Sequence, residues 1–240
     1  MIQISENIFL DKHIFELDIP TAFLPSPYKS LPFLIIKNFL KPHEAALFVD
    51  EVYKDDEAEI AKVKSEVIHG VVEAKVVKKY RDTNIYAISE FLNELYQGRF
   101  QEYQAEIEDY FNIAMTLSTS VQALEYTKGG YYVQHADDSS TVIDQDKNIV
   151  AFTPVAPERK ITTVLFATSY SETPDNKHSF KGGELVFNFL KDQDGNQVEF
   201  KADAGDMIIF PSNPYFSHEV KEVEAGYRLT LVQWHNAILN

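Results

Sequence analysis

Residues 204–235 read AGDMIIFPSNPYFSHEVKEVEAGYRLTLVQWH, and this segment sets the expectation for the rest of the chain. It contains three short runs rich in β-branched and large apolar residues, separated by turns that contain proline or glycine. Such runs between turns predict β-strands. Working outward, we expect eight strands in all, at 119–126, 130–135, 161–169, 184–190, 197–201, 206–210, 218–223 and 227–235. Eight short strands of this kind are typical of a sandwich or barrel, and a jelly roll is the simplest arrangement.

The first 118 residues have helical patterning instead. Residues 34–36 predict a short strand, and Pro42 suits the first turn of a helix. The buried face of that helix is expected to comprise Ala45, Ala46, Phe48, Val49, Val52 and Tyr53. Ser89 should cap a longer helix of about seven turns, running to Ala114 and interrupted near Gly98. The charged span 55–64 is predicted to be a solvated helix or loop, and 73–79 a weak strand. The expected fold is mainly β with N-terminal helices (α+β).

The amino-acid composition limits the classes of partner and metal ligand that the protein can have. The chain has 240 residues, enough for a single domain spanning 1–240. Its 22 Lys and Arg against 37 Asp and Glu give a net charge of −15, which disfavours nucleic acid and anionic membranes as partners and favours a cationic or neutral substrate. With no cysteine, a metal site must use histidine and carboxylate ligands. Residues 1–30 show no export signal, so a cytoplasmic location is expected.

A metal site is predicted from three residues. His135 and Asp137 are two apart on an expected strand, so both side chains leave by the same face. His218 follows the strand at 206–210 after a short loop and can supply a third ligand. Two histidines and one carboxylate leave open positions on an iron ion. Asp138 is the rival carboxylate, but it should point to the opposite face.

An arginine accompanies these ligands. Arg228 lies in an otherwise apolar strand, where it needs an anion, and its planar fork suits a carboxylate. Thr230 shares its face and can donate a second hydrogen bond. The simpler alternatives are a structural pair of His135 with Asp137, and a structural ion pair of Arg228 with one of the acids.

The remaining histidines and one tyrosine are assigned positions from their sequence context. His235 is expected to cap a strand or lie at its rim, while strand parity places Tyr131 on the metal face. Solvated positions are expected for His13, His43, His69 and His178.

The order of these motifs resembles that of the Fe(II)/2-oxoglutarate-dependent dioxygenases, closest to the prolyl 4-hydroxylase and PKHD-type hydroxylase branch. The likeness runs from about residue 31 to 234. It includes the His-x-Asp motif at 135–137, the segment FKGGEL at 180–185, GDMIIFP at 205–211, HEV at 218–220 and GYRLTLVQW at 226–234. The resemblance implies a double-stranded β-helix as the catalytic core over 119–236, supported by residues 1–118. It implies His135, Asp137 and His218 as iron ligands, and Arg228, with Thr230, as the residues that hold 2-oxoglutarate.

Some positions differ from the family pattern. Phe166 occupies a place where some prolyl hydroxylases have a tyrosine that contacts 2-oxoglutarate, and Tyr126 is the candidate to replace it. Lys181 stands where an acid is usual. The segments 139–159 and 170–181 are long and polar, and we expect them to be lids over the substrate, with variable surface loops as the alternative.

The expected function is therefore a hydroxylase that uses Fe(II), 2-oxoglutarate and O₂, with ascorbate as an optional addition, and releases succinate and CO₂. A carboxylate at position 137 favours hydroxylation over the halogenation carried out by related enzymes. The substrate is expected to be a protein or peptide residue of the prolyl type, with a free amino acid or small metabolite as the alternative. A non-catalytic cupin-like metal-binding module, a hydrolase or isomerase using zinc or manganese, and a nucleic-acid demethylase are the other classes weighed.

Overall fold

The computed structural model describes residues 1–19, 30–53, 59–60, 80–175 and 177–239. Within these ranges the helices are η1 (Lys12–Glu16), α1 (Pro42–Val52), α2 (Glu90–Phe111) and η2 (Pro214–Phe216). In this described part of the chain, every helix is too short or too polar to cross a membrane.

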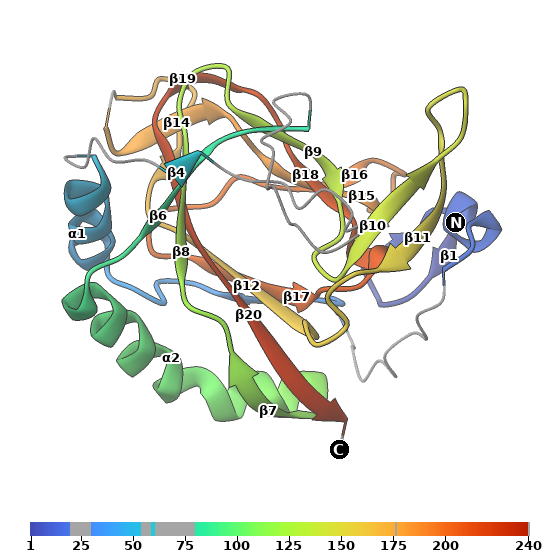
Figure 1. The fold of residues 1–240 in the computed structure, drawn as a ribbon, viewed down its shortest axis with the longest axis horizontal. Helices are drawn as coiled ribbons and strands as arrows, with labels where there is room; N and C mark the ends of the chain where they lie inside the picture. Colours follow the sequence, from blue (N-terminus) through green and yellow to red (C-terminus); the bar gives the residue numbers. More distant parts are fainter. Residues whose placement is uncertain (20–29, 54–58, 61–79, 176, 240) are drawn as a thin grey trace, which may run out of the picture.

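Two large antiparallel sheets form the body of the molecule (Figure 1). One has the strand order β1-β2-β15-β18-β9-β5, with β16 also on β15. The other has the order β3-β17-β12-β20-β8-β6-β4, with β7 also on β20. The strands of the first sheet are β1 (Ile2–Gln3), β2 (Phe9–Leu10), β5 (Arg81–Asp82), β9 (Tyr131–His135), β15 (Leu185–Lys191), β16 (Gln197–Phe200) and β18 (His218–Val220). Those of the second are β3 (Leu34–Ile36), β4 (Glu59–Ile60), β6 (Asn84–Ala87), β7 (Ile113–Ser118), β8 (Gln122–Tyr126), β12 (Ile161–Phe166), β17 (Met207–Pro211) and β20 (Arg228–Leu239).

Successive side chains along the central strands of the second sheet point to opposite faces, so the sheet has a hydrophobic core on each face. On β20, Leu229 and Leu231 face the helices, whereas Val232 faces the other sheet. Strand β12 alternates in the same way, with Leu165 on the helix side and Phe166 on the inner side. Helices α1 and α2 cover the outer face of this sheet (Figure 1). The predicted jelly roll backed by helices is thus confirmed, and Arg228 and Thr230 lie on the inner face.

The two long helices begin where the sequence predicted. Ser89 Oγ accepts a hydrogen bond from the Leu92 amide at the start of α2. The expected end at Ala114 is wrong, because Asn112 adopts a left-handed conformation (φ 52°) that ends the helix and starts β7. Gly98 does not break the helix. In α1, Ala45, Phe48, Val49 and Val52 are buried as expected. Ala46 is only half-buried, and Tyr53, which follows the helix, is 53% exposed.

The two expected lid segments contain strands. Most of 139–159 is a β-hairpin of β10 (Ser139–Ile143) and β11 (Ile149–Pro154), which projects from the sheets in Figure 1. Residues 170–181 include the end of β13 (Ser169–Tyr170) and most of β14 (Ser179–Gly182), which pairs with β19 (Val223–Gly226). The expected strand at 218–223 is therefore two strands in different sheets, β18 and β19. The predictions for 73–79 and for most of 55–64 lie outside the described residues.

Candidate metal centre

His135 and His218 come together because their strands are neighbours. Strand β9 ends at His135, β18 begins at His218, and the antiparallel register makes the two residues direct partners. Just beyond β9, the amides of Asp137 and Asp138 both donate to the Ser212 carbonyl at 3.1 Å, which fixes the turn that carries the carboxylate. The sequence predicted all three residues as ligands, and the fold brings their side chains to one point.

Donor atoms of these three residues lie within 4.8 Å of one another, and we call the group the metal cluster. His135 Nε2 is 4.0 Å from Asp137 Oδ1, and His218 Nε2 is 3.9 Å from Asp137 Oδ2. Each histidine has its Nδ1 against a backbone carbonyl, at 2.9 Å for His135 and 3.0 Å for His218. A proton on Nδ1 satisfies these contacts and leaves the lone pair of each Nε2 free to bind a metal ion beside the carboxylate. The donor set therefore fits one divalent metal ion.

Burial and charge control the ionisation of the metal cluster. Burial, with a smaller contribution from the neighbouring His218, lowers the pKa of His135 to about 3, so the ring is neutral and available as a ligand. Burial opposes ionisation of Asp137, but His218, His135 and the Thr162 hydroxyl together hold its pKa below the usual value. Thr162 Oγ1 donates to Asp137 Oδ2 at 2.7 Å. Asp137 is thus a carboxylate held in place by a neighbouring hydroxyl, and Thr162 is a site residue that sequence reasoning missed.

Asp138 does not join the metal cluster. Its side chain is buried and accepts a hydrogen bond from Ser139 Oγ at 2.6 Å. Burial raises its pKa to about 6. The structure thus brings Asp137, and not Asp138, to the two histidines, although both residues follow the end of β9 and strand alternation does not apply to them.

Arg228 lies in the core between the sheets with aromatic rings around it. Its Cζ is 4.8 Å from the ring centre of Tyr126, 5.3 Å from Phe166 and 5.7 Å from Phe180. The side chain is 1% exposed, and burial lowers its pKa to about 10. Its one hydrogen bond among the described residues is a long one of 3.4 Å to Thr230 Oγ1, and Nε has none. A buried guanidinium without a carboxylate is costly, so this site fits an anionic ligand such as 2-oxoglutarate.

The other predicted cosubstrate residue, Tyr126, pairs with Arg228 across β8 and β20. Its buried ring packs against the guanidinium, next to Phe166. Gly183 closes the other side: a Cβ there would lie 2.9 Å from Arg228 Cδ.

The aromatic neighbour of the metal cluster differs from the prediction. Tyr132, rather than Tyr131, stacks on the His135 ring, with ring centres 3.6 Å apart and planes 14° apart. The pairing of β9 with β18 shifts in register between these residues, so simple alternation does not hold.

His235 is also placed differently from the prediction. It is fully buried, stacks on Phe100 at 4.7 Å, and its Nδ1 lies 2.8 Å from Ser118 Oγ. Burial lowers its pKa to about 4. It belongs to the core between α2 and the sheet, not to a rim. His13 and His43 are exposed as expected, and His69 lies outside the described residues.

A family model for the 2OG-Fe(II) oxygenase superfamily matches residues 121–236, the segment that holds the metal cluster and Arg228. Residues 121–236 belong to the 2OG-Fe(II) oxygenase superfamily. A PKHD-type hydroxylase from Colwellia psychrerythraea is 32% identical over 110 residues, which is 46% of this chain and 39% of the relative. The matched segments span only 27–39% of the length of the curated relatives.

Solved structures share the fold of this chain. A prolyl-4-hydroxylase from Pseudomonas putida superposes with a TM-score of 0.58 at 17% identity, covering 85% of this chain and 92% of that one. A prolyl hydroxylase from Trichoplax adhaerens, in complex with a hypoxia inducible factor oxygen degradation domain peptide fragment, gives 0.55 at 18% identity, covering 85% and 83%. The relationship to the prolyl 4-hydroxylase and PKHD-type branch, predicted from the motifs, is confirmed.

Proposed function

We propose that this protein is an Fe(II)- and 2-oxoglutarate-dependent hydroxylase that oxidises an unactivated C–H bond and releases succinate and CO₂. The observation that carries the proposal is the pairing of two features. The metal cluster has three donors for one ion, and the nearby interior holds Arg228 without a carboxylate partner among the described residues. A zinc hydrolase could use the three ligands but has no evident need for Arg228.

Each residue has a specific task in this proposal. His135, Asp137 and His218 hold the iron, and Thr162 keeps the carboxylate oriented. Arg228 binds the carboxylate of 2-oxoglutarate that is remote from the metal, and Thr230 assists with its hydroxyl. When bound, the iron and 2-oxoglutarate supply the oxidising chemistry with O₂.

The surroundings of Arg228 favour tight binding of 2-oxoglutarate. The rings of Tyr126, Phe166 and Phe180 exclude water from the guanidinium. An ion pair formed there is stronger than one in solvent.

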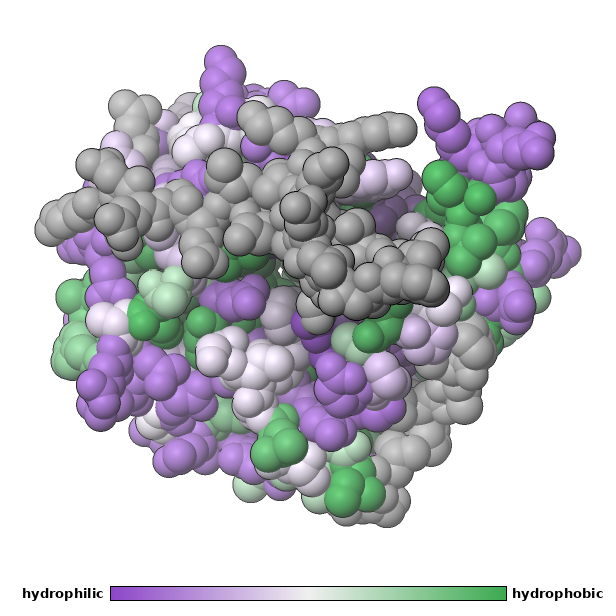
Figure 2. Space-filling view, in the orientation of Figure 1, coloured by the Kyte–Doolittle hydropathy of each residue, from purple (hydrophilic) through white to green (hydrophobic). Residues whose placement is uncertain are grey.

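For the substrate, we infer a protein or peptide residue of the prolyl type, with a free amino acid or small metabolite as the alternative. The Trichoplax neighbour holds a peptide. The β10–β11 hairpin follows directly after Asp137 and exposes apolar side chains at Val142, Ile143 and Val150. Figure 2 shows this hydrophobic patch below the hydrophilic tip of the hairpin. A patch of this kind on a projecting hairpin is suited to contact with a bound chain, so we assign the hairpin to the substrate side of the site.

The proposal is tested by incubating the protein with Fe(II), 2-oxoglutarate, O₂ and a library of peptides, amino acids and small metabolites. Mass spectrometry should find a product heavier by one oxygen atom together with stoichiometric succinate. Metal binding without 2-oxoglutarate binding or succinate formation would instead favour a non-catalytic metal-binding module.

A further inference from the structure

The serine that follows β17, Ser212, is hydrogen-bonded through its amide, its carbonyl and its hydroxyl. The amide donates to the Lys160 carbonyl at 3.0 Å, and the carbonyl accepts from the amides of Asp137 and Asp138 at 3.1 Å. The hydroxyl oxygen lies 2.8 Å from Thr162 Oγ1 and has no other hydrogen-bond partner among the residues that the structure describes. The residue is 1% exposed. Because the backbone contacts already fix the main chain here, the buried hydroxyl needs a separate explanation.

The direction of the bond between the two hydroxyl groups follows from counting their protons. Thr162 has one hydroxyl proton and donates it to Asp137 Oδ2 at 2.7 Å. The carboxylate of Asp137 has only acceptor atoms, so this bond cannot run the other way. Thr162 Oγ1 can therefore only accept from Ser212 Oγ. We call this ordered set of donors, from Ser212 to Thr162 to Asp137, the hydroxyl chain.

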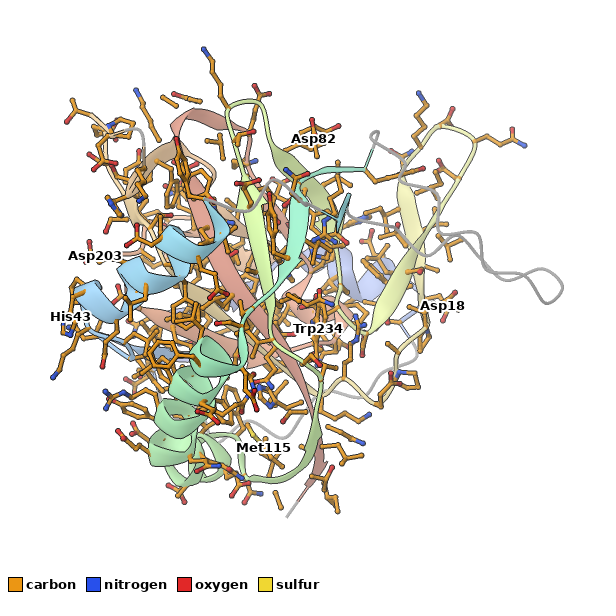
Figure 3. The ribbon with its side chains drawn as sticks, turned by 60° about the vertical axis from the view of Figure 1, so that its left-hand side comes forward. Asp18, His43, Asp82, Met115, Asp203 and Trp234 are labelled. Atoms are coloured by element: carbon orange, nitrogen blue, oxygen red, sulfur yellow. The ribbon has the colours of Figure 1, made fainter. Side chains whose placement is uncertain are left out.

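The hydroxyl chain joins the two large sheets at the metal cluster. Thr162 lies on β12 of the second sheet, whereas Asp137 follows β9 of the first. Thr162 is paired with Phe210 on one side and with Trp234 on the other, and Figure 3 shows Trp234 within the body of the molecule. The oxygen that Thr162 contacts, Asp137 Oδ2, is also the one that lies 3.9 Å from His218 Nε2. The hydroxyl chain therefore ends on a carboxylate oxygen that faces a second metal ligand.

A hydroxyl group that accepts a hydrogen bond becomes a stronger donor. Hydrogen bonds in a chain polarise one another, and each is stronger in the protein interior than in water. Thr162 and Ser212 are both 1% exposed, so the hydroxyl chain lies in such an interior. The bond from Ser212 also restricts rotation of the Thr162 hydroxyl, which keeps its proton directed at Asp137. Without Ser212 Oγ, Thr162 would be a weaker and less well oriented donor.

We propose that Ser212 is a positioning residue of the metal centre, and that its hydroxyl orients the Asp137 carboxylate for metal binding by acting through Thr162. This inference rests on the proposed function and adds a residue to its metal centre. The hydroxyl of Ser212 contacts no metal ligand itself, so its whole effect passes through Thr162. The backbone contacts of Ser212 remain in a side-chain variant, so replacing the serine removes the hydroxyl alone.

The test measures Mn(II) binding to the full chain by titration calorimetry in a double-mutant cycle. S212A should weaken Mn(II) binding by about 2- to 10-fold, the usual effect of losing one hydrogen bond between neutral groups. T162V should weaken it more, because it removes the direct contact with Asp137. In the double variant, S212A should add no further loss, since its path to the carboxylate is already interrupted. S118A is the matched control: Ser118 Oγ lies 2.8 Å from His235 Nδ1, away from the metal cluster, and Mn(II) binding should equal that of the parent.

Co(II) in place of Mn(II) gives a second readout, because its visible absorption bands depend on the geometry of its ligands. S212A should shift these bands in the same direction as T162V, and S118A should leave them unchanged. If the alanine variant does not fold by circular dichroism, S212C replaces it, since it keeps a side chain of similar size with only a weak donor.

Parent-like Mn(II) affinity or parent-like Co(II) bands in S212A would overturn the inference. An equal loss of affinity from S212A with and without the Thr162 hydroxyl would also overturn it, by assigning Ser212 to the turn at Asp137 alone. A parent that binds no Mn(II) would contradict the metal ligands, and with them the proposed function, instead.

Discussion

Replacing Arg228 by glutamine should greatly raise the requirement for 2-oxoglutarate. The arginine is 1% exposed and has one long hydrogen bond, to Thr230, so an incoming carboxylate would be its main counter-charge. Truncating one partner of a buried, hydrogen-bonded charge pair costs about 2–5 kcal/mol, which corresponds to roughly 30- to 4,000-fold in affinity. Replacing Thr230 by valine removes a single hydrogen bond and should cost only about 0.5–1.5 kcal/mol, or roughly 2- to 10-fold.

The assay measures succinate formed without primary substrate as a function of 2-oxoglutarate concentration, with Mn(II) affinity determined in parallel. Arg228→Gln should raise the apparent KM for 2-oxoglutarate and leave metal affinity unchanged. Its free energy of unfolding should stay the same or rise, because the unliganded fold no longer buries an unpaired charge. An unchanged KM together with a strongly destabilised fold would refute the reasoning, since it would assign Arg228 to a structural pair.

Three further predictions follow from other parts of the structure. Thr162→Val removes the hydroxyl that holds Asp137 and should weaken Mn(II) binding by about 10- to 100-fold in calorimetry, whereas unchanged binding would contradict this positioning role. Shortening the 139–159 segment should preserve succinate formation and abolish the hydroxylated product; retention of both activities would make it an ordinary surface loop. Burial lowers the pKa of His235 to about 4, so the folded state resists a proton that the unfolded chain accepts near pH 6.5, and stability falls as the pH drops through this window. Between pH 7 and 5 this amounts to about 2 kcal/mol in urea unfolding, and His235→Gln should remove that part of the pH dependence; an equally steep pH dependence in the variant would contradict the assignment.

The sequence predicted those features of the fold that depend on local alternation and turns. His135 and Asp137 could be assigned to one face from their spacing, and Arg228 stood out as a charge in an apolar strand. The end of α2 was missed because Asn112 stops the helix by adopting a left-handed conformation, although the apolar spacing continues beyond it. The β10–β11 hairpin was read as a polar loop because the polar turn at 144–148 outweighed the short β-branched runs on either side.

Other contacts around the metal cluster join segments that are distant in the sequence. Arg81 reaches His135 only through Tyr132, across the pairing of β5 with β9. Arg159 contacts Trp234, which is 75 residues further along the chain. Thr162 touches Asp137 from the opposite sheet. Spacing along the sequence holds no information about such contacts, so these residues become visible only in the folded chain.

Metal binding by the two histidine variants tests the central claim most directly. Titration calorimetry with anaerobic Fe(II), or Mn(II) in its place, should show one tightly bound ion for the parent. His135→Ala and His218→Ala should each lose that binding, while circular dichroism shows an intact fold. If both variants bound one ion as tightly as the parent, the assignment of His135, Asp137 and His218 as the metal ligands would be wrong.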